Sequence, residues 1–414
     1  MTKTAVVLSG GGSCGAYEIG VWKALRRLKF DYQIITGVSV GALNGFLMVQ
    51  NDYKVALKMW SNVNYDLLFN DFIDDKNKDI SNTEVYKKYI NGFLENGGMD
   101  ISNLENVVSE FFDENKFYNS KIDFGIMDYN LSKLRSESYT KEQLPKDKVK
   151  DYIIASATCF PAFKIKKIEK ENYIDGGYGD NLPINLAIKM GAEKIIAVDL
   201  EQVGFKKKPK YDNIDIKYIR PKNDIGSFLV FDKKQACKNI KYGYNDTMKL
   251  YGELKGSCYT FYKFGYDYFI RKIDKRINSY VNNLENNSNS KTIGKIKSNF
   301  TKKVLNIDNL DIFDIVNQSI DLLGATLKID DTKTYFIYQF NNIMKRKFNN
   351  IESLDYDLIT TKIKNNQITS LLGSKYIVKY IYENLKTNKQ AELSLLYILF
   401  KKEFLAAVYL ICLR

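Results

Sequence analysis

The sequence contains no histidine among its 414 residues. This absence excludes mechanisms in which an imidazole acts as general base, including the Ser-His-Asp triad, and it removes a common zinc ligand. The cysteines are few and scattered without C-x-x-C spacing: Cys14, Cys159, Cys237, Cys258 and Cys412. We therefore expect no metal site and no disulfide framework, and a reducing, cytoplasmic compartment.

Other scarce features narrow the class of protein further. Only 5 prolines occur, which excludes long proline-rich linkers. No basic and apolar leader precedes the strand-like run at 4–9, so we expect no signal peptide. The apolar stretch at 393–413 is interrupted by Lys401, Lys402 and Glu403. Because each charge at a bilayer centre costs roughly 2.5–3.5 kcal/mol, this stretch predicts a buried helix and not a transmembrane helix.

The net charge is +13, with lysines clustered at 164–170 and 206–210. Such an excess is typical either of an ordinary solvated surface in a lysine-rich chain or of a protein that meets an anionic partner. No nucleic-acid-binding motif accompanies the lysines, so we expect no nucleic-acid partner. Peripheral contact with an anionic membrane remains the alternative to the solvated surface.

The first 250 or so residues alternate apolar runs with helical patterns. Strands are predicted at 4–9, 33–36, 122–128, 194–200 and 214–219, helices at 15–28, 40–49 and 149–157, and a largely helical segment at 51–114. This alternation favours an α/β fold with a mostly parallel sheet covered on both faces.

The character of the chain changes after about Gly256. The segment 278–290 is rich in Asn and Ser, which predicts a loop or linker. Helical spacing follows at 312–323, 335–348, 370–385 and 392–413. We therefore predict two domains, 1–255 with the α/β pattern and 256–414 as a helical region of unknown role that carries no chemical motif.

A glycine loop follows the first predicted strand, with Gly10, Gly11, Gly12 and Gly15. Backbone N–H groups at such a helix start stabilise a phosphate or an oxyanion. The spacing also satisfies the G-x-G-x-x-G dinucleotide fingerprint, but no acidic residue closes the second strand to hold a ribose. Nucleotide binding is therefore disfavoured.

A serine turn, Gly37-Val38-Ser39-Val40-Gly41, joins the second predicted strand to a helix. The G-x-S-x-G pattern in this context is typical of a nucleophile elbow, although a tight turn with a capping serine is the simpler alternative. Because the chain has no imidazole, a nucleophilic Ser39 needs another proton acceptor, and a carboxylate is the natural candidate.

Asp175 is the carboxylate whose sequence context best fits a proton acceptor. It ends an apolar strand pattern and precedes Gly176 and Gly177, so its side chain can project from a sheet rim into a cleft. The alternative is a turn aspartate that bonds its own backbone, which is common before glycine.

Taken together, the three motifs resemble the patatin-like phospholipase family, in its bacterial type. Members combine a G-G-G-x-[KR]-G loop, a G-x-S-x-G nucleophile and a D-G-[GA] acid in this order, and the resemblance covers 4–254. It is supported by the segment 155–161 and by Asn181-x-Pro183. One departure is Cys14, which stands where the family has a basic residue.

The resemblance implies a three-layer α/β/α sandwich and a Ser-Asp dyad that hydrolyses fatty-acyl esters of phospholipids or lysophospholipids. Ser39 would be the nucleophile and Asp175 the proton acceptor, with no metal or other cofactor. Oxyanion donors would come from Gly10, Gly11, Gly12 and Val40, with Gly15, Gly37, Gly41, Gly176 and Gly177 supporting the turns. The alternative is a catalytically silent lipid-binding or scaffold protein on the same fold.

Overall fold

The computed structural model describes residues 2–69, 82–286, 312–351, 361–362, 374–387 and 399–413. The chain divides into two compact units, Met1–Leu250 and Tyr251–Arg414. The division lies five residues before the domain boundary expected from the sequence.

In the described part of the first unit, strands form an eight-stranded sheet in the order β5-β6-β3-β2-β1-β7-β8, with β4 paired to β3. Neighbouring strands from β3 to β8 along this order are parallel, whereas β4, β5 and β6 join antiparallel. The prediction of a mostly parallel sheet is therefore confirmed. The strands are β1 (Thr4–Leu8), β2 (Ile34–Gly37), β3 (Asp123–Asn130), β4 (Arg135–Thr140), β5 (Lys166–Ile168), β6 (Glu171–Asp175), β7 (Lys194–Val198) and β8 (Asp215–Ile219).

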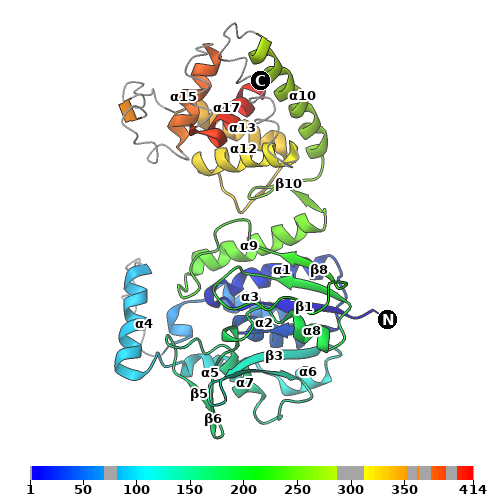
Figure 1. The fold of residues 1–414 in the computed structure, drawn as a ribbon, viewed down its shortest axis with the longest axis vertical. Coiled ribbons are helices and arrows are strands. Elements are labelled where there is room, and N and C mark those ends of the chain that lie inside the picture. The colour runs from blue at the N-terminus through cyan, green and yellow to red at the C-terminus, as the bar shows by residue number, and fades with distance from the viewer. Residues whose placement is uncertain are drawn as a thin grey trace. The chain divides into compact units, whose positions relative to one another are not determined.

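Helices lie on both sides of the strands, which gives the three-layer arrangement (Figure 1). Residues of β1 alternate between the two faces, and Ala5 and Val7 pack with Ala187 of α8 on one of them. On the other face of the sheet, Gly45 of α2 lies close to Ile35 of β2. A Cβ added to Gly45 would lie 3.3 Å from the Ile35 side chain. The helices are α1 (Ala16–Arg27), α2 (Val40–Val49), α3 (Tyr53–Trp60), α4 (Asn82–Asn96), α5 (Ser102–Phe111), α6 (Glu114–Asn119), α7 (Val149–Ser156), α8 (Ile184–Lys189) and α9 (Lys233–Leu250), with short 3-10 turns η1 (Gly12–Gly15), η2 (Tyr65–Leu67) and η3 (Gly176–Tyr178).

The register beside β3 brings the ends of two other strands together. Gly37, the last residue of β2, lies opposite Ile126, and Asp175, the last residue of β6, lies opposite Asp128. Strand β4 occupies the other edge of β3, so β2 and β6 run toward each other along the same edge. Their ends are two β3 residues apart, about 7 Å at a rise of ~3.4 Å per residue. Side chains that follow β2 and end β6 can therefore meet.

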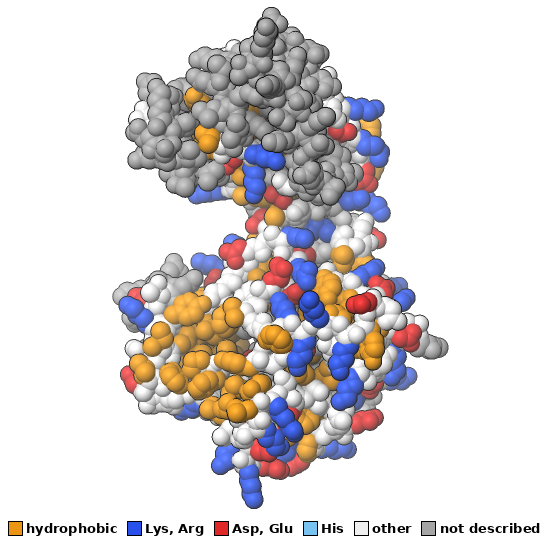
Figure 2. Space-filling model, viewed as in Figure 1, with side chains coloured by type: hydrophobic (Ala, Val, Ile, Leu, Met, Phe, Trp, Pro, Cys, Tyr) orange, Lys and Arg blue, Asp and Glu red, His pale blue; other side chains and the backbone are white. Residues whose placement is uncertain are grey.

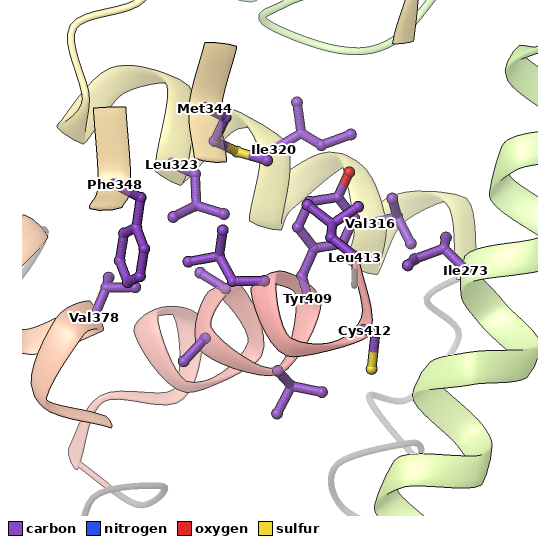
Figure 3. Packing of buried hydrophobic residues seen from close by; sticks show 14 of the residues in the cluster. Ile273, Val316, Ile320, Leu323, Met344, Phe348, Val378, Tyr409, Cys412 and Leu413 are labelled. Carbon is purple, nitrogen blue, oxygen red and sulfur yellow. The ribbon is translucent and has the colours of Figure 1, made fainter. Parts of the chain in front are cut away.

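The second unit is mainly helical in its described part, as predicted. Figure 3 shows Tyr409 of α17 directed toward Val316 and Ile320 of α12, and Phe348 of α13 beside Val378 of α15. A small sheet in the order β11-β10-β9 is an addition that the helical pattern did not predict. The elements are α10 (Tyr266–Asn286), α12 (Ile312–Thr326), α13 (Ile337–Asn349), α15 (Lys375–Lys386), α17 (Lys401–Cys412), β9 (Leu254–Lys255), β10 (Thr260–Tyr262) and β11 (Thr334–Tyr335).

The loop predicted at 278–290 is wrong over its first part, because α10 continues to Asn286. Residues Phe269, Ile270, Ile273 and Ile277 are buried along one face of α10. Their packing outweighs the weak helix propensity of the asparagines that follow. The remaining predicted positions 287–290 lie outside the described residues, as do 370–373 and 392–398 of the two helices predicted near the C-terminus.

The buried C-terminal helix is confirmed over α17. Its side chains from Glu403 to Leu410 are all buried, the charged Glu403 among them, whereas Lys401 and Lys402 are exposed. Across the described ranges, no helix combines the length and the apolar character needed to cross a membrane.

Candidate active site

Ser39 lies at the turn between β2 and α2, in a backbone conformation that residues other than glycine rarely adopt. Its φ is 55°, and its side chain is 7% exposed. The flanking positions must be glycine because the neighbouring backbone is too close for a side chain. A Cβ on Gly37 would lie 2.3 Å from the Gly41 carbonyl oxygen, and a Cβ on Gly41 would lie 2.5 Å from the Leu8 carbonyl oxygen. The turn therefore holds the hydroxyl at the carboxyl edge of the sheet, as a nucleophile elbow does.

Asp175 ends β6 and meets Ser39 directly. The Ser39 hydroxyl lies against the Asp175 carboxyl, and the Gly177 N–H donates to Asp175 Oδ1 at 2.8 Å. Burial raises the pKa of Asp175 to about 6, although the neighbouring Ser39 hydroxyl and the Gly177 N–H oppose the rise. Gly176 allows this geometry because a Cβ there would lie 2.1 Å from the Met127 carbonyl oxygen. The two side chains singled out by the sequence are thus in contact.

The glycine loop lies on the other side of Ser39. Gly11, Gly12 and Val40 line the same cavity as Ser39 and Asp175. Gly12 has a φ of 50°, and a Cβ there would lie 2.1 Å from the Phe228 carbonyl oxygen. The Ser13 N–H also donates to this oxygen, at 2.9 Å. The segment around Phe228 therefore fixes the loop.

Two of the predicted glycines have other contacts. The Gly10 N–H donates to the Asn181 carbonyl oxygen at 3.2 Å, and Gly10 does not line the cavity in the described structure. To bind an oxyanion, the Gly10 N–H would therefore have to break its hydrogen bond to the Asn181 carbonyl oxygen. Gly15 packs against α2, where a Cβ would lie 2.3 Å from Val40 Cγ2.

Cys14, the departure from the family pattern, is a packed thiol. It is fully buried, and its Sγ lies 3.6 Å from the Ile225 carbonyl oxygen and 3.5 Å from that of Gly226. Burial raises the pKa of its thiol to about 12, so the thiol stays neutral at neutral pH. Cys14 supplies no positive charge to the loop.

A cavity of about 870 Å³ opens beside the Ser39-Asp175 pair. Most of its wall is aliphatic and aromatic, with contributions from Leu47 of α2, Trp60 of α3, and Leu104 and Val108 of α5. Figure 2 shows hydrophobic side chains gathered on the face beside α4, with Lys and Arg side chains bordering them. A site of this size and lining suits a long apolar chain.

The sequence analysis missed residues that hold the site from behind. The Ser156 hydroxyl of α7 donates to the Met127 carbonyl oxygen at 2.6 Å and accepts from the Ser39 N–H at 3.0 Å. Asp128 is fully buried beside Asp175. The position of Asp128 directly after the apolar Ile126 and Met127 was the one available signal for it, whereas nothing local distinguishes Ser156.

A second buried group supports the cavity wall. Asn44 of α2 donates to Glu18 Oε2 at 2.7 Å and to the Gly15 carbonyl oxygen at 3.0 Å, and it accepts from Trp60 Nε1 at 2.8 Å. Burial raises the pKa of Glu18 to about 8. This network ties α1, α2 and α3 together beneath the glycine loop.

Comparison with known proteins identifies the domain. Residues 6–188 match the family model described as Patatin-like phospholipase, and this range includes both Ser39 and Asp175. This part of the chain is a patatin-like phospholipase domain, as the resemblance predicted.

Three curated relatives are similar to the chain. "Triacylglycerol lipase 4" of Saccharomyces cerevisiae is 35% identical over 116 residues, which are 28% of this chain and 12% of the relative. "Lysophospholipase NTE1" of Scheffersomyces stipitis is 27% identical over 213 residues, 47% of this chain and 11% of the relative. "Probable lipid hydrolase 463L" of Invertebrate iridescent virus 6 is 26% identical over 243 residues, 54% of this chain and 81% of the relative. The chain thus spans only about a tenth of the first two relatives.

Proposed function

We propose that the patatin-like domain of this chain is a lipid acyl hydrolase that works through Ser39 and Asp175. The observation that carries the proposal is the juxtaposition of these two side chains at the wall of an apolar cavity. The names of the three relatives, a lipase, a lysophospholipase and a probable lipid hydrolase, support the same class of reaction.

In the proposed reaction, Ser39 Oγ attacks the ester carbonyl carbon while Asp175 accepts the hydroxyl proton. The tetrahedral intermediate collapses to an acyl-Ser39, and Asp175 returns its proton to the departing alcohol. A water molecule then attacks the acyl-enzyme while Asp175 accepts its proton, and as the bond to the acyl group breaks Asp175 returns that proton to Ser39 Oγ, which releases the fatty acid and restores both side chains. No step requires a metal or a further cofactor.

Burial of Asp175 compensates for the absent imidazole. An ordinary aspartate with a pKa of ~3.9 is a weaker base than imidazole at ~6.5 by about 3.5 kcal/mol. Because burial raises the pKa of Asp175 to about 6, most of this deficit disappears. The remaining difference is under ~1 kcal/mol.

Stabilisation of the oxyanion is assigned to the N–H groups of Gly11, Gly12 and Val40. Val40 is the first residue of α2, so its N–H belongs to the positive end of the helix dipole. One such donor is worth about 2.7–4 kcal/mol in comparable sites, which is enough to offset the weaker base.

The proposed substrate is a phospholipid or lysophospholipid. A cavity of about 870 Å³ with an aliphatic and aromatic wall would hold the fatty-acyl portion and leave a polar headgroup outside. Because such lipids are presented in membranes or micelles, we also infer peripheral contact with an anionic membrane.

Both lysine clusters combine ion-paired and exposed side chains. Lys164 pairs with Asp100 at 3.6 Å, and Lys166 pairs with Glu105 at 2.6 Å. In the other cluster Lys206 pairs with Asp199 at 2.6 Å, so both clusters are partly neutralised; Lys207, Lys208 and Lys210 are exposed, as are Lys167 and Lys170.

Ser39→Ala compared with wild type is the direct test. We expect the full chain to release fatty acid from defined phospholipid vesicles and to react with a fluorophosphonate probe, and Ser39→Ala to do neither. Asp175→Asn should also lose hydrolysis, whereas Asp180→Asn should retain most of it. Asp180 is a matched control because it is buried in the same motif and burial raises its pKa to about 6 as well, but it accepts from backbone N–H groups.

The alternative, a silent lipid-binding protein on the same fold, predicts a different result. In that case wild type and Ser39→Ala would bind lipid equally, and neither would release fatty acid or be labelled by the probe.

A further inference from the structure

The segment 202–205, which we name the rim segment, forms part of the cavity wall between β7 and β8. It exposes two large apolar side chains: Val203 is 87% exposed and Phe205 is 61% exposed. Exposed apolar groups concentrated at one site mark an interaction surface.

The rim segment is hydrogen-bonded directly to the catalytic turns. The Phe205 N–H donates to the Gly177 carbonyl oxygen at 3.3 Å, and the Gly177 N–H donates to Asp175 Oδ1 at 2.8 Å. Two hydrogen bonds through Gly177 therefore connect the exposed Phe205 to Asp175, the proposed base.

A second connection runs through Asn181 to the glycine loop. The Asn181 N–H donates to the Phe205 carbonyl oxygen, and Asn181 Nδ2 donates to the Val203 carbonyl oxygen at 3.3 Å. The Asn181 carbonyl oxygen accepts from the Gly10 N–H at 3.2 Å. Gly204 packs tightly on this residue, since a Cβ there would lie 2.6 Å from Asn181 Cβ. A displacement of the rim segment would therefore be transmitted to both sides of Ser39.

The surroundings of the rim segment favour one kind of partner. Ile90 and Phe93 of α4 also line the cavity and are exposed, so apolar side chains flank the opening from two elements. Lys207, Lys208 and Lys210 follow the rim segment directly and are exposed. Apolar side chains that enter the acyl boundary, bordered by lysines that meet anionic headgroups, are the combination that binds an anionic lipid surface.

We propose that the rim segment docks on an anionic phospholipid surface and that docking favours the reactive arrangement of the Ser39 site through Gly177 and Asn181. The inference rests on the proposed hydrolase function and adds the surface and its coupling to the site. A lipid surface shifts the site only by binding one arrangement better than another, so docking and reactivity must change together.

The test uses the full chain and vesicles of ether-linked phosphatidylcholine with phosphatidylglycerol, which offer an anionic surface but no cleavable ester. Two quantities are measured: vesicle binding by co-sedimentation, and the rate of fluorophosphonate labelling at Ser39 with and without vesicles. For wild type we expect salt-sensitive binding and labelling that is about tenfold faster on vesicles.

The triple variant Lys207→Glu, Lys208→Glu and Lys210→Glu lies outside the cavity wall. It should bind anionic vesicles about 100-fold more weakly, roughly fivefold for each lysine, while labelling without vesicles stays unchanged. The double variant Val203→Ser and Phe205→Ser should lose the acceleration by vesicles. Leu134→Ser, at an equally exposed position away from the cavity, should behave as wild type in both measurements.

The outcomes separate the two proposals. Wild type that binds vesicles with no change in labelling, or rim variants that keep the full acceleration, would overturn this inference and leave the hydrolase intact. A rim segment that instead holds two chains together would show a dimer of wild type in solution that the double variant dissociates, which also overturns it. If wild type is not labelled at Ser39 under any condition, the proposed function itself fails.

Discussion

Asp128 of β3 and Asp175 of β6 lie directly opposite each other in an antiparallel pair, so two buried carboxyl groups share one face of the sheet. Opposite Cβ atoms in such a pair are about 4.5–5.5 Å apart. Within the described structure, neither oxygen of Asp128 has a hydrogen-bond partner. Burial, followed by the charges of Asp175 and Glu137, raises the pKa of Asp128 well above its usual range. Both effects favour the protonated form of Asp128.

The first prediction concerns the pH dependence of hydrolysis. Asp175 acts as a base only when it is deprotonated, and its pKa is about 6. We expect kcat/KM for a soluble short-chain ester to be constant above this pH and to fall about tenfold for each unit below it. A pH-rate profile of wild type measures this; a profile flat down to pH 4 would contradict the assignment of Asp175.

Asp128→Asn tests the charge state of the pair. Asparagine has the shape of a protonated aspartate, so the acid limb of the pH profile should move by less than about 0.3 units. If Asp128 were ionised in the working enzyme, its removal would lower the acid limb by roughly one unit or more.

The same variant should change stability in a defined direction. Because the pKa of Asp128 is raised on folding, wild type loses stability as the pH rises above the ordinary value of a carboxyl. Asp128→Asn removes this loss, so its melting temperature relative to wild type should increase from pH 5 to pH 9. A relative melting temperature that is independent of pH would contradict the buried neutral form.

Gly12→Ala tests the glycine loop. The new Cβ would lie 2.1 Å from the Phe228 carbonyl oxygen at a positive φ, so the loop must shift and misplace its N–H donors. We expect kcat/KM to fall by about 10²–10³, the effect of losing one oxyanion donor. Gly191→Ala is the control, because it also has a positive φ but its nearest atom lies 3.9 Å away. Equal activity of the two variants would count against an oxyanion role for the loop.

Glu18→Gln tests the buried network behind the cavity. Burial raises the pKa of Glu18 from 4.5 to about 8, so wild type should lose stability as the pH rises through this interval. The slope is about 1.4 kcal/mol for each pH unit, and the variant should lack this contribution. Melting temperatures at pH 5 and pH 8 measure it, with the exposed Glu142→Gln as control. Parallel pH dependence of wild type and Glu18→Gln would contradict a protonated Glu18.

The sequence by itself determined the local features of this protein. The alternating strands and helices predicted the parallel sheet, and the three glycine-rich turns indicated the site; the structure then shows that Gly12, Gly37, Gly41 and Gly176 have no room for a Cβ. The absence of histidine directed attention to a carboxylate, and the chain order of the motifs indicated the family.

Only the tertiary structure decided what depends on register and burial. The contact of Ser39 with Asp175 follows from β2 and β6 meeting along one edge of β3, which no local pattern encodes. The raised pKa of Asp175, the engaged N–H of Gly10 and the bonds from the rim segment to Asn181 arise from residues far apart in the chain. Likewise, the asparagine-rich end of α10 is helical because long-range packing of its apolar face outweighs local propensity.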